Sequence, residues 1–418
     1  MTKDMPSTSV HRGPVQPGGG RKGGVLIAAF PTPKAVPLPD SGTVIGRSWL
    51  AERGLADTEV SNAHLRIDRR GGTLHAADAG SRNGTWLNGE RLEPNELVPL
   101  EDGAVVRIGR TLLVPRESFD GELEPAPPIG GLVGAFGLRA VARALTGLSQ
   151  SASDNVLIEG ETGVGKELAA RAVARVLGRE TPFAAVNVAG VAAGVFESQM
   201  FGHVAGAFSG AGNASAGIAR AHHGGTLFLD EIGELDRELQ AKLLRLLENR
   251  EVLPVGADRP VPVDVLVIAA TNQDLEAMVE EGSFRRDLFT RLAKARIALP
   301  PLRERPEDIF GIAQALASFA PEDVEVEALE RLMLEPWPGN VRELAAVLSA
   351  ARRVDPAPGL RLWALESVLG KAHTQKVALT QQTIEAAIAA EGGNVTAAAA
   401  RLGVSRGKLL RLRKRVKE

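Results

Sequence analysis

The chain has 418 residues, of which 44% are hydrophobic and 24% charged, with a formal net charge of -2. This composition is typical of a globular protein of roughly three domains. The absence of cysteine excludes disulfides and thiolate metal sites and fits a reducing compartment. No apolar run reaches the length of about 18 residues that a membrane helix needs, and the start lacks the apolar core of a signal peptide. We therefore expect a cytoplasmic protein with no membrane partner.

Short strands are predicted in the first quarter of the chain. Residues 1–24 are rich in Gly, Pro, Ser and Thr, which indicates a disordered tail. From 25 to 115, polar and apolar residues alternate in short stretches such as 63–68 and 73–76, between clusters of Gly, Asn and Asp. This spacing predicts an all-β sandwich. An acidic, proline-rich segment at 116–130 predicts a linker after it.

Three polar segments of this β region resemble the forkhead-associated (FHA) domain, whose loops bind phosphothreonine: Gly46-Arg47, residues 61–64 and residues 80–89. A phosphate carries about -1.5 to -2 charges, and a guanidinium can offer it a forked, charge-assisted contact. The resemblance implies three phosphate ligands, Arg47, Ser61 and Arg82, and two residues that hold the peptide backbone, Asn62 and Asn83. The alternative is that these residues only form turns, since Asn-Gly pairs favour hairpins whatever the function.

A different pattern begins at about 131 and continues to 355. Continuous apolar runs at 156–158, 226–229 and 265–268 indicate buried parallel strands, and helical stretches such as 239–247 lie between them. The pattern predicts an α/β nucleotide-binding domain that is followed by a helical lid. A linker at 356–378 and a short helical domain at 379–418 complete the expected organisation.

The segment from 160 to 167 is a phosphate-binding loop placed between a strand and a helix. Its backbone N–H groups and the helix N-terminus favour phosphate oxygens, so we expect ATP there, with Lys166 at the β- and γ-phosphates. Downstream, Asp230 is expected to place Mg²⁺ and Glu231 to polarise the attacking water. The residues expected to bind the nucleotide are Gly160, Glu161, Thr162, Gly163, Val164, Gly165, Lys166 and Glu167.

A phenylalanine framed by small residues interrupts this nucleotide-binding region at 206–211. Burying a Phe is worth roughly 1.5–3 kcal/mol, so its place on a loop favours a contact with a partner protein. With Phe201-Gly202-His203 before it, the segment resembles the signature loop of sigma-54-dependent transcriptional activators, bacterial enhancer-binding proteins of the AAA+ class, although Ser209 replaces the usual Thr. The alternative is a Gly-rich surface loop. The expected sigma-54 contacts are Gly206, Ala207, Phe208, Ser209, Gly210 and Ala211.

Further segments of the region resemble this family in the family's order. The resemblance assigns to Asn187 the role of a switch that holds the catalytic glutamate. It assigns to Asn272 the role of the first nucleotide sensor. It assigns arginine fingers to Arg285 and Arg291, and the second sensor to Arg342 in the segment from Trp337 to Leu344. Fingers that act in a neighbouring subunit imply a ring, which is a hexamer in the family. Each arginine taken alone could equally be a surface ion-pair residue.

The end of the chain is basic and predicts two short helices. Its last eighteen residues hold eight Lys or Arg and one acidic residue. Gly403 breaks a first helix and Ser405 can cap a second one, so the segment reads as a helix-turn-helix that resembles the Fis-type DNA-binding domain. Arg406, Lys408 and Arg411 would then face the major groove. The alternative is a helical hairpin for dimerisation.

These resemblances predict a multidomain activator that combines an FHA sandwich, an AAA+ ATPase and a DNA-binding helix-turn-helix. It would bind DNA upstream of promoters and use ATP hydrolysis to remodel sigma-54 RNA polymerase holoenzyme into the open complex. Phosphothreonine recognition by the FHA domain would bring in kinase signalling. Two alternatives stay open: a DNA-bound regulator of the same ancestry that no longer engages sigma-54, and a scaffold driven by the FHA domain.

Overall fold

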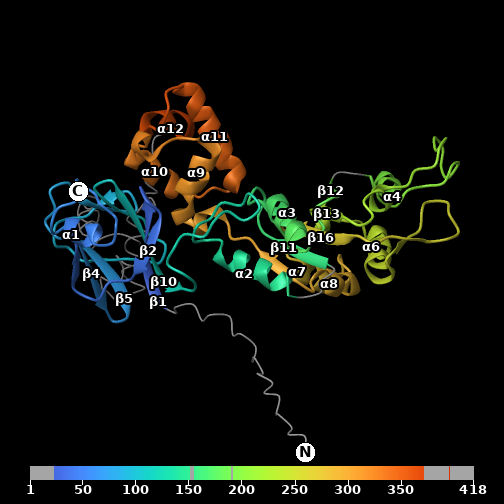
Figure 1. Ribbon diagram of the computed structural model, residues 1–418, viewed down its shortest axis with the longest axis horizontal. Helices are drawn as coiled ribbons and strands as arrows, with labels where there is room; N and C mark the ends of the chain where they lie inside the picture. Colours follow the sequence, from blue (N-terminus) through green and yellow to red (C-terminus); the bar gives the residue numbers. More distant parts are fainter. Residues whose placement is uncertain (1–22, 151–154, 190–191, 371–394, 396–418) are drawn as a thin grey trace, which may run out of the picture.

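The computed structural model describes residues 23–150, 155–189, 192–370 and 395. Figure 1 shows a β-sandwich and a group of helices, α9 to α12, side by side at one end of the molecule. An α/β domain extends from them towards the other end, where loops project beyond helices α4 and α6. The prediction of an all-β sandwich followed by an α/β domain with a helical lid is confirmed.

The β-sandwich consists of two antiparallel sheets. The four-stranded sheet has the order β3-β4-β5-β8, and a short helix, α1 (Arg47–Ala51), follows β3. Its strands are β3 (Thr43–Ile45), β4 (Leu65–Arg70), β5 (Thr73–Asp78) and β8 (Val98–Pro99). The six-stranded sheet has the order β2-β1-β10-β9-β6-β7. Its strands are β1 (Gly23–Phe30), β2 (Lys34–Pro37), β6 (Thr85–Leu87), β7 (Glu90–Arg91), β9 (Val106–Ile108) and β10 (Thr111–Phe119).

Strand β1 is buried on both faces, which is unusual for a strand in a two-layer sandwich, where one face commonly meets water. Leu26 and Ala28 point into the sandwich core. Ile27 and Phe30 belong instead to a hydrophobic cluster that continues into the helical lid. The uninterrupted apolar run of β1 reflects these two separate cores.

The α/β domain is built on a five-stranded parallel sheet with the order β12-β13-β16-β11-β17. Its strands are β11 (Asn155–Glu159), β12 (Phe183–Asn187), β13 (Thr226–Asp230), β16 (Leu266–Thr271) and β17 (Arg296–Ala298). Apolar side chains alternate between the two faces of the sheet, so each face has its own hydrophobic cluster.

Helices cover both faces of this sheet. Residues of α2 (Arg139–Leu148) and α3 (Lys166–Val176) pack on one face. Residues of α4, α6, α7 and α8 pack on the other face. These helices span Ala193–Phe201, Arg237–Asn249, Leu275–Glu280 and Arg286–Leu292. The remaining elements are α5 (Ile218–Ala221), a 3-10 turn at Ile232–Glu234, and the hairpin of β14 (Glu251–Val252) and β15 (Val261–Pro262).

The lid contains helices α9 (Ile309–Ala317), α10 (Val326–Met333), α11 (Asn340–Val354) and α12 (Leu362–Leu369), with 3-10 turns at Leu302–Glu304, Pro306–Asp308 and Pro321–Asp323. Helix α12 falls inside 356–378, which we expected to be a linker. Its Ala364 and Leu365 are buried in the cluster of the lid, so the structure adds this helix to the lid.

The predicted helix-turn-helix, with Arg406, Lys408 and Arg411, lies outside the described residues, as does nearly all of the predicted N-terminal tail. In the part of the chain that the structure describes, no helix is both long and apolar enough to cross a membrane.

Candidate functional site

The phosphate-binding loop joins the carboxyl end of β11 to the amino end of α3. Its glycines permit the tight turn, and Gly163, with a φ of 79°, leaves no room for a side chain. A Cβ at this position would lie 2.3 Å from the carbonyl oxygen of Gly339 in the lid. Lys166 is buried, and its Nζ donates to the Gly160 carbonyl oxygen at 3.1 Å. The loop is therefore shaped for backbone contacts with a ligand and for a close approach of the lid.

The polar residues at the neighbouring strand ends lie at the same edge of the sheet. Asn187 and Asp230 are register partners on β12 and β13. Glu231 adopts a left-handed φ of 57°, and its N–H donates to Asp230 Oδ1 at 3.0 Å. The Nζ of Lys166 lies 3.5 Å from Glu231 Oε1. Two carboxylates and a buried ammonium beside a phosphate-binding loop fit Mg²⁺ and nucleotide phosphates in chemical type.

The two predicted sensor residues also reach the loop. Asn272, which follows β16, donates from Nδ2 to Thr162 Oγ1 at 3.2 Å. The backbone N–H of Arg342 donates to the Gly163 carbonyl oxygen at 3.3 Å. The structure thus gathers the loop and five of the predicted catalytic residues at one edge: Asn187, Asp230, Glu231, Asn272 and Arg342.

Asn340 is a contact between lid and loop that sequence reasoning missed. This fully buried residue accepts from the Leu302 N–H through Oδ1 at 2.7 Å. Its Nδ2 donates to Glu161 Oε2 at 3.0 Å and to the Thr162 carbonyl oxygen at 3.1 Å. A φ of 52° directs the side chain into this position. The adjacent Gly339-Asn340 pair signals a turn, but nothing local in the sequence indicates bonds to a loop about 180 residues away.

Glu161 adds a second bond between loop and lid. It forms a two-pronged ion pair with Arg303, at 2.7 and 2.8 Å. Hydrogen bonds from Arg303 and then from Asn340 hold the pKa of Glu161 well below its usual range, at about 2. The carboxylate therefore stays ionised throughout the physiological range and fixes the loop against the lid.

The two predicted arginine fingers lie away from this site. Arg285 pairs with Asp287 at 2.8 Å, and Arg291 pairs with Glu248 at 3.2 Å, both on the surface. The carbonyl oxygen of Arg291 accepts from Asn155 Nδ2 at the start of β11, whereas the phosphate-binding loop follows the end of that strand. A five-residue strand separates its ends by about 13 Å. The structure therefore does not bring Arg291 into the site of its own chain, and the described ion pair of Arg285 is with Asp287 rather than with a residue of that site.

The segment from 206 to 211 forms the tip of a projecting loop between α4 and α5 (Figure 1). Antiparallel pairing of His203 with Ser215 closes the base of the loop, and the Gly206 N–H donates to the Ala211 carbonyl oxygen at 2.7 Å. Phe208 is 47% exposed, and its one described ring contact is with His203, at a centroid distance of 5.1 Å. The loop thus presents an aromatic ring to solvent from a fixed base.

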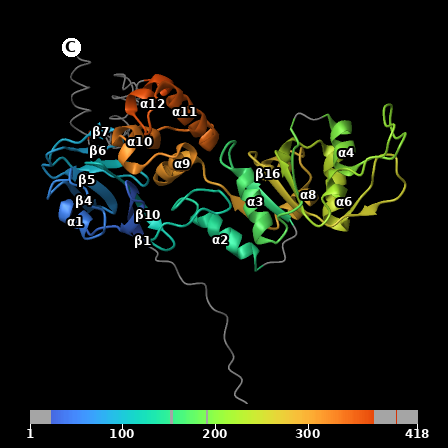
Figure 2. The ribbon, with the colours of Figure 1, turned by 45° about the horizontal axis from the view of Figure 1, so that its top comes forward.

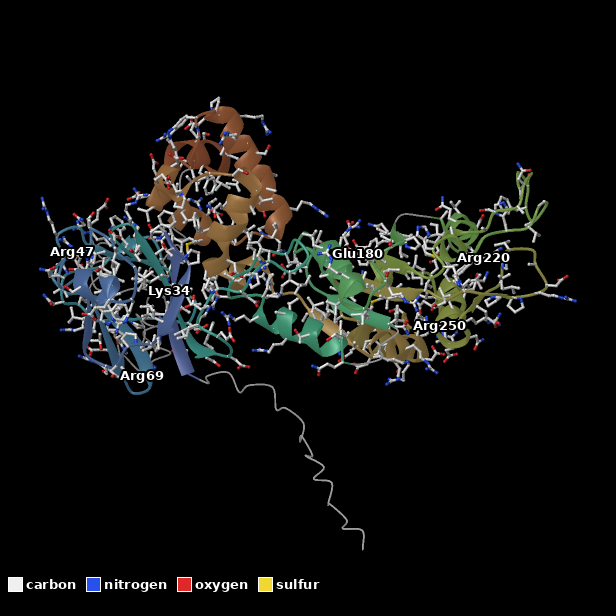
Figure 3. The ribbon with its side chains drawn as sticks, in the orientation of Figure 1. Lys34, Arg47, Arg69, Glu180, Arg220 and Arg250 are labelled. Carbon is white, nitrogen blue, oxygen red and sulfur yellow. The ribbon has the colours of Figure 1, made fainter. Side chains whose placement is uncertain are left out.

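The five predicted phosphopeptide residues lie on three linked loops at one end of the β-sandwich. The Arg82 N–H donates to Ser61 Oγ at 3.0 Å, and Asn83 Nδ2 donates to the Glu59 carbonyl oxygen at 2.7 Å. Arg47 donates to the carbonyl oxygens of the same loop at Thr58 and Val60. Figure 3 shows Arg47 at the outer edge of the domain, remote from the α/β domain. Arg47, Asn62, Arg82 and Asn83 are exposed, and Ser61 is half-buried.

Two buried residues hold these loops together. His64 is fully buried and bridges the Ser61 N–H and the Gly84 carbonyl oxygen, at 3.0 Å each. Asp78 accepts from Ser81 and Thr85 at 2.6 and 2.8 Å. Burial alone would raise the pKa of Asp78, but these hydrogen bonds outweigh it and lower the pKa. The loops are therefore pre-formed, which reduces the ordering cost of binding a peptide.

Family models match four consecutive parts of the chain. The FHA domain model matches residues 43–109, and the sigma-54 interaction domain model matches 137–298. The AAA+ ATPase lid domain model matches 303–382, and the model of the Fis family of bacterial regulatory proteins matches 381–415. In this order of domains the chain is similar to sigma-54-dependent transcriptional regulators. The predicted AAA+ and FHA domains and the Fis-type DNA-binding segment are thereby confirmed.

Individual relatives agree with this similarity. The DNA-binding transcriptional regulator NtrC of Bradyrhizobium sp. is 41% identical over 249 residues, which are 57% of this chain and 51% of NtrC. The putative uric acid sigma-54-dependent transcriptional regulator UacR of Escherichia coli is 43% identical over 242 residues, which are 55% of this chain and 40% of UacR. The chain thus spans about half the length of these relatives or less.

One solved structure is also similar. The crystal structure of NtrX from Brucella abortus in complex with ATP shares 29% sequence identity with this chain. The match covers 69% of this chain and 70% of NtrX, with a TM-score of 0.49.

Proposed function

We propose that this chain is an ATP-driven activator that remodels sigma-54 RNA polymerase holoenzyme from a DNA site upstream of the promoter. The observation that carries the proposal is the combination of an assembled nucleotide site with an exposed Phe208 on a projecting loop of the same domain. The first part would supply work from ATP, and the second would apply it to a partner protein.

The residues of the nucleotide site divide the expected tasks. Lys166 and the loop N–H groups would hold the phosphates, while Asp230 and Glu231 would hold Mg²⁺ and orient the attacking water. Mg²⁺ would neutralise charge that develops on the phosphates. Asn272 and Arg342 contact the loop and would register the nucleotide state there. Arg285 and Arg291 would complete the site of a neighbouring subunit, which requires a ring, and we propose a hexamer.

The other two segments would select the DNA site and receive the regulatory signal. The Fis-family segment would bind DNA through Arg406, Lys408 and Arg411, and the FHA loops would bind a phosphothreonine protein. A pre-formed set of exposed arginine and asparagine side chains beside the half-buried Ser61 supports the second proposal. Cytoplasmic localisation belongs to the same proposal, because the partners are DNA and RNA polymerase.

The experiment that tests the motor compares the wild-type chain with Phe208→Ala in binding to purified sigma-54. The nucleotide is a transition-state mimic of ATP hydrolysis, and ATP turnover is measured in parallel. We expect the variant to lose binding at least about 10-fold, as a centrally placed aromatic contact does, while turnover is kept. The matched control is Trp363→Ala, which removes an exposed aromatic ring from α12 of the lid, away from the loop.

Two results would overturn the proposal. Equal binding of wild type and Phe208→Ala would remove the loop from the contact with sigma-54. No binding by a wild-type chain that hydrolyses ATP would favour a DNA-bound regulator that no longer engages sigma-54. Two departures from the family's usual pattern leave this alternative open: Ser209 replaces Thr, and Val204-Ala205 replace more polar residues before the loop.

A further inference from the structure

The outward face of the six-stranded FHA sheet is covered by the lid of the ATPase. Ile27 and Phe30 of β1 and Val114 of β10 share one hydrophobic cluster with α9, α10 and α11. The rings of Phe30 and Phe310 meet edge to face, with centroids 5.0 Å apart. Figures 1 and 2 both show the lid helices against this sheet. The two domains therefore share a core and are not connected by the 116–130 segment alone.

Three arginines of the FHA domain bind the lid around this shared core. Arg107 pairs with Glu330 and Glu327 of α10, at 2.7 and 3.0 Å. Arg110 donates to carbonyl oxygens of the turn before α10, at 3.2 and 3.3 Å. Arg116 forms a two-pronged pair with Glu307, at 2.6 and 3.2 Å. Complementary charges at two points and hydrogen bonds at a third fix the orientation of one domain on the other.

The pair between Arg107 and Glu330 is the most buried of these contacts. The side chains of Arg107 and Glu330 are 10% and 6% exposed. The Arg107 guanidinium also lies over the Trp86 ring, 4.4 Å from its centroid. Removing one partner of a buried ion pair leaves an uncompensated charge. The pair therefore disfavours any other register of the two domains.

This interface lies between the phosphopeptide loops and the phosphate-binding loop. Strand β6, which carries Trp86, begins two residues after Asn83. The turn after β6 meets the residue that follows α10, since a Cβ at Gly89 would lie 3.2 Å from Leu334 Cδ1. From there the chain continues to Asn340, whose side chain holds the phosphate-binding loop. Short chain segments and the contacts across this interface thus connect the two binding sites.

We propose that the FHA domain and the lid act as one body, and that phosphopeptide binding and nucleotide binding are coupled through the Trp86, Arg107 and Glu330 contact. The coupling rests on the proposed function of the two sites, whereas the shared body does not. Coupling of this kind is reciprocal: a peptide that changes nucleotide affinity by some factor is itself bound more or less tightly by the same factor.

The first experiment tests the interface in the full chain without any peptide. Arg107→Glu and Glu330→Arg each place like charges together in the interface, and the double variant restores opposite charges. We expect each single change to lower the thermal midpoint, and the double variant to recover part of the loss. The matched control is Arg69→Glu on β4, which Figure 3 shows on the far side of the FHA domain. A double variant that loses the sum of both single losses would overturn the shared body.

The second experiment tests the coupling by hydrogen exchange with ADP as the probe. We expect ADP to slow exchange in β6 and in the turn at Asn88-Gly89 in the wild-type chain. We expect no such slowing in Arg107→Glu or in Arg110→Ala. Arg110→Ala is the milder change and keeps the test available if Arg107→Glu fails to fold. Unchanged exchange in the FHA strands of the wild-type chain, with ADP bound, would overturn the coupling.

The third experiment separates this coupling from the proposed FHA function. A phosphothreonine peptide selected from a library on the full chain is titrated with and without ADP. We expect its dissociation constant to change by about 5- to 150-fold, the usual range of coupled sites, and by less in Arg107→Glu. If no peptide binds although ADP protects β6, phosphothreonine recognition is wrong and the coupling holds. If the peptide binds with one affinity throughout, the coupling is wrong and recognition holds.

Discussion

The ATPase domain meets its surroundings in two contrasting ways. At the nucleotide edge, the loop at 160–166 is bound by Asn340, Arg303 and Asn272, and a Cβ at Gly163 would collide with the lid at 2.3 Å. At the opposite end, a Cβ at Gly206 or Gly210 would meet no atom within 4 Å. Glycine at the nucleotide edge thus allows the lid backbone to approach closely, whereas the glycines of the projecting loop have no atoms near them.

The difference in packing indicates that the nucleotide edge has to be positioned precisely and that the projecting loop has to move. Positioning phosphates requires groups held within fractions of an ångström, so the nucleotide edge is supported by buried bonds. A loop that pushes on a partner has to change its position, and few contacts leave it at the low-stability end of the molecule. The base of the loop is nevertheless paired at His203 and Ser215, so movement of the domain would reach the tip.

The largest effect is expected from Arg291→Ala, which tests whether the nucleotide edge is complete within one chain. ATP should still bind, because Arg291 is remote from its own phosphate-binding loop. Turnover should fall by about 10³-fold or more, since a finger supplied by a neighbour contributes about 10³–10⁵. Steady-state ATPase and nucleotide-binding assays check both parts.

A mixing experiment sharpens this test. Lys166→Ala chains and Arg291→Ala chains are each expected to be inactive, but mixed rings contain intact sites between unlike neighbours and should recover turnover. The matched surface control is Arg245→Ala on α6, which should behave as wild type. Full activity of Arg291→Ala alone would contradict the assignment of this finger.

The next effect concerns Asn340, the central bond of the nucleotide edge. Asn340→Ala leaves the buried N–H of Leu302 without its partner, at a cost of about 1–3 kcal/mol, and removes the bonds to Glu161 and to the Thr162 carbonyl oxygen. Alanine in the left-handed conformation adds roughly 1–2 kcal/mol. We expect weaker ADP binding and a lower thermal midpoint.

Asn340→Gly separates the two causes, because glycine accepts the φ of 52° without strain. It should lose the bonds alone and lie between wild type and Asn340→Ala in both measurements. If all three proteins bind ADP equally, the contact of lid and loop does not support the nucleotide site.

The smallest effect is expected from the ion pair of Glu161 with Arg303, which is more than one-third exposed on both sides. Its contribution should stay below about 1 kcal/mol. Because the pKa of Glu161 is lowered to about 2 in the folded protein, the contribution is complete above its ordinary value of about 4.5 and is lost as the pH falls towards 2.

The measurement compares thermal midpoints of wild type and Glu161→Gln from pH 6 to pH 3. The difference should be largest at pH 6 and shrink steadily below pH 5. A difference that grows as the pH falls would contradict the sign of the pKa change.

The sequence predicts local patterns well and distant contacts poorly. The sandwich and the parallel sheet could be predicted because alternating and continuous apolar runs are periodic signals within a few residues. The phosphate-binding loop and the strand-end carboxylates could be predicted because strand ends of a parallel sheet meet at one edge. The roles assigned to Asn187, Arg285, Arg291 and Arg342 remain predictions.

The contact of the FHA domain with the lid was not predicted, although a signal exists. The run 25–30 contains no polar residue, although a strand with one buried face needs apolar residues only at alternate positions. The sequence does not show what covers its second face, because Phe30 meets Phe310, far along the chain. Asn340 was missed for the same reason, since its partner Glu161 is 179 residues away.

The double burial of β1 also limits modularity. A chimera that exchanged residues 23–119 for an unrelated domain would remove the FHA domain. It would also remove the sheet that covers one side of the lid. Phe310 and its apolar neighbours in the lid would then face water, and Glu307 and Glu330 would lose the arginines that pair with them. In this chain the FHA domain can therefore be exchanged only together with the lid residues that pack against it.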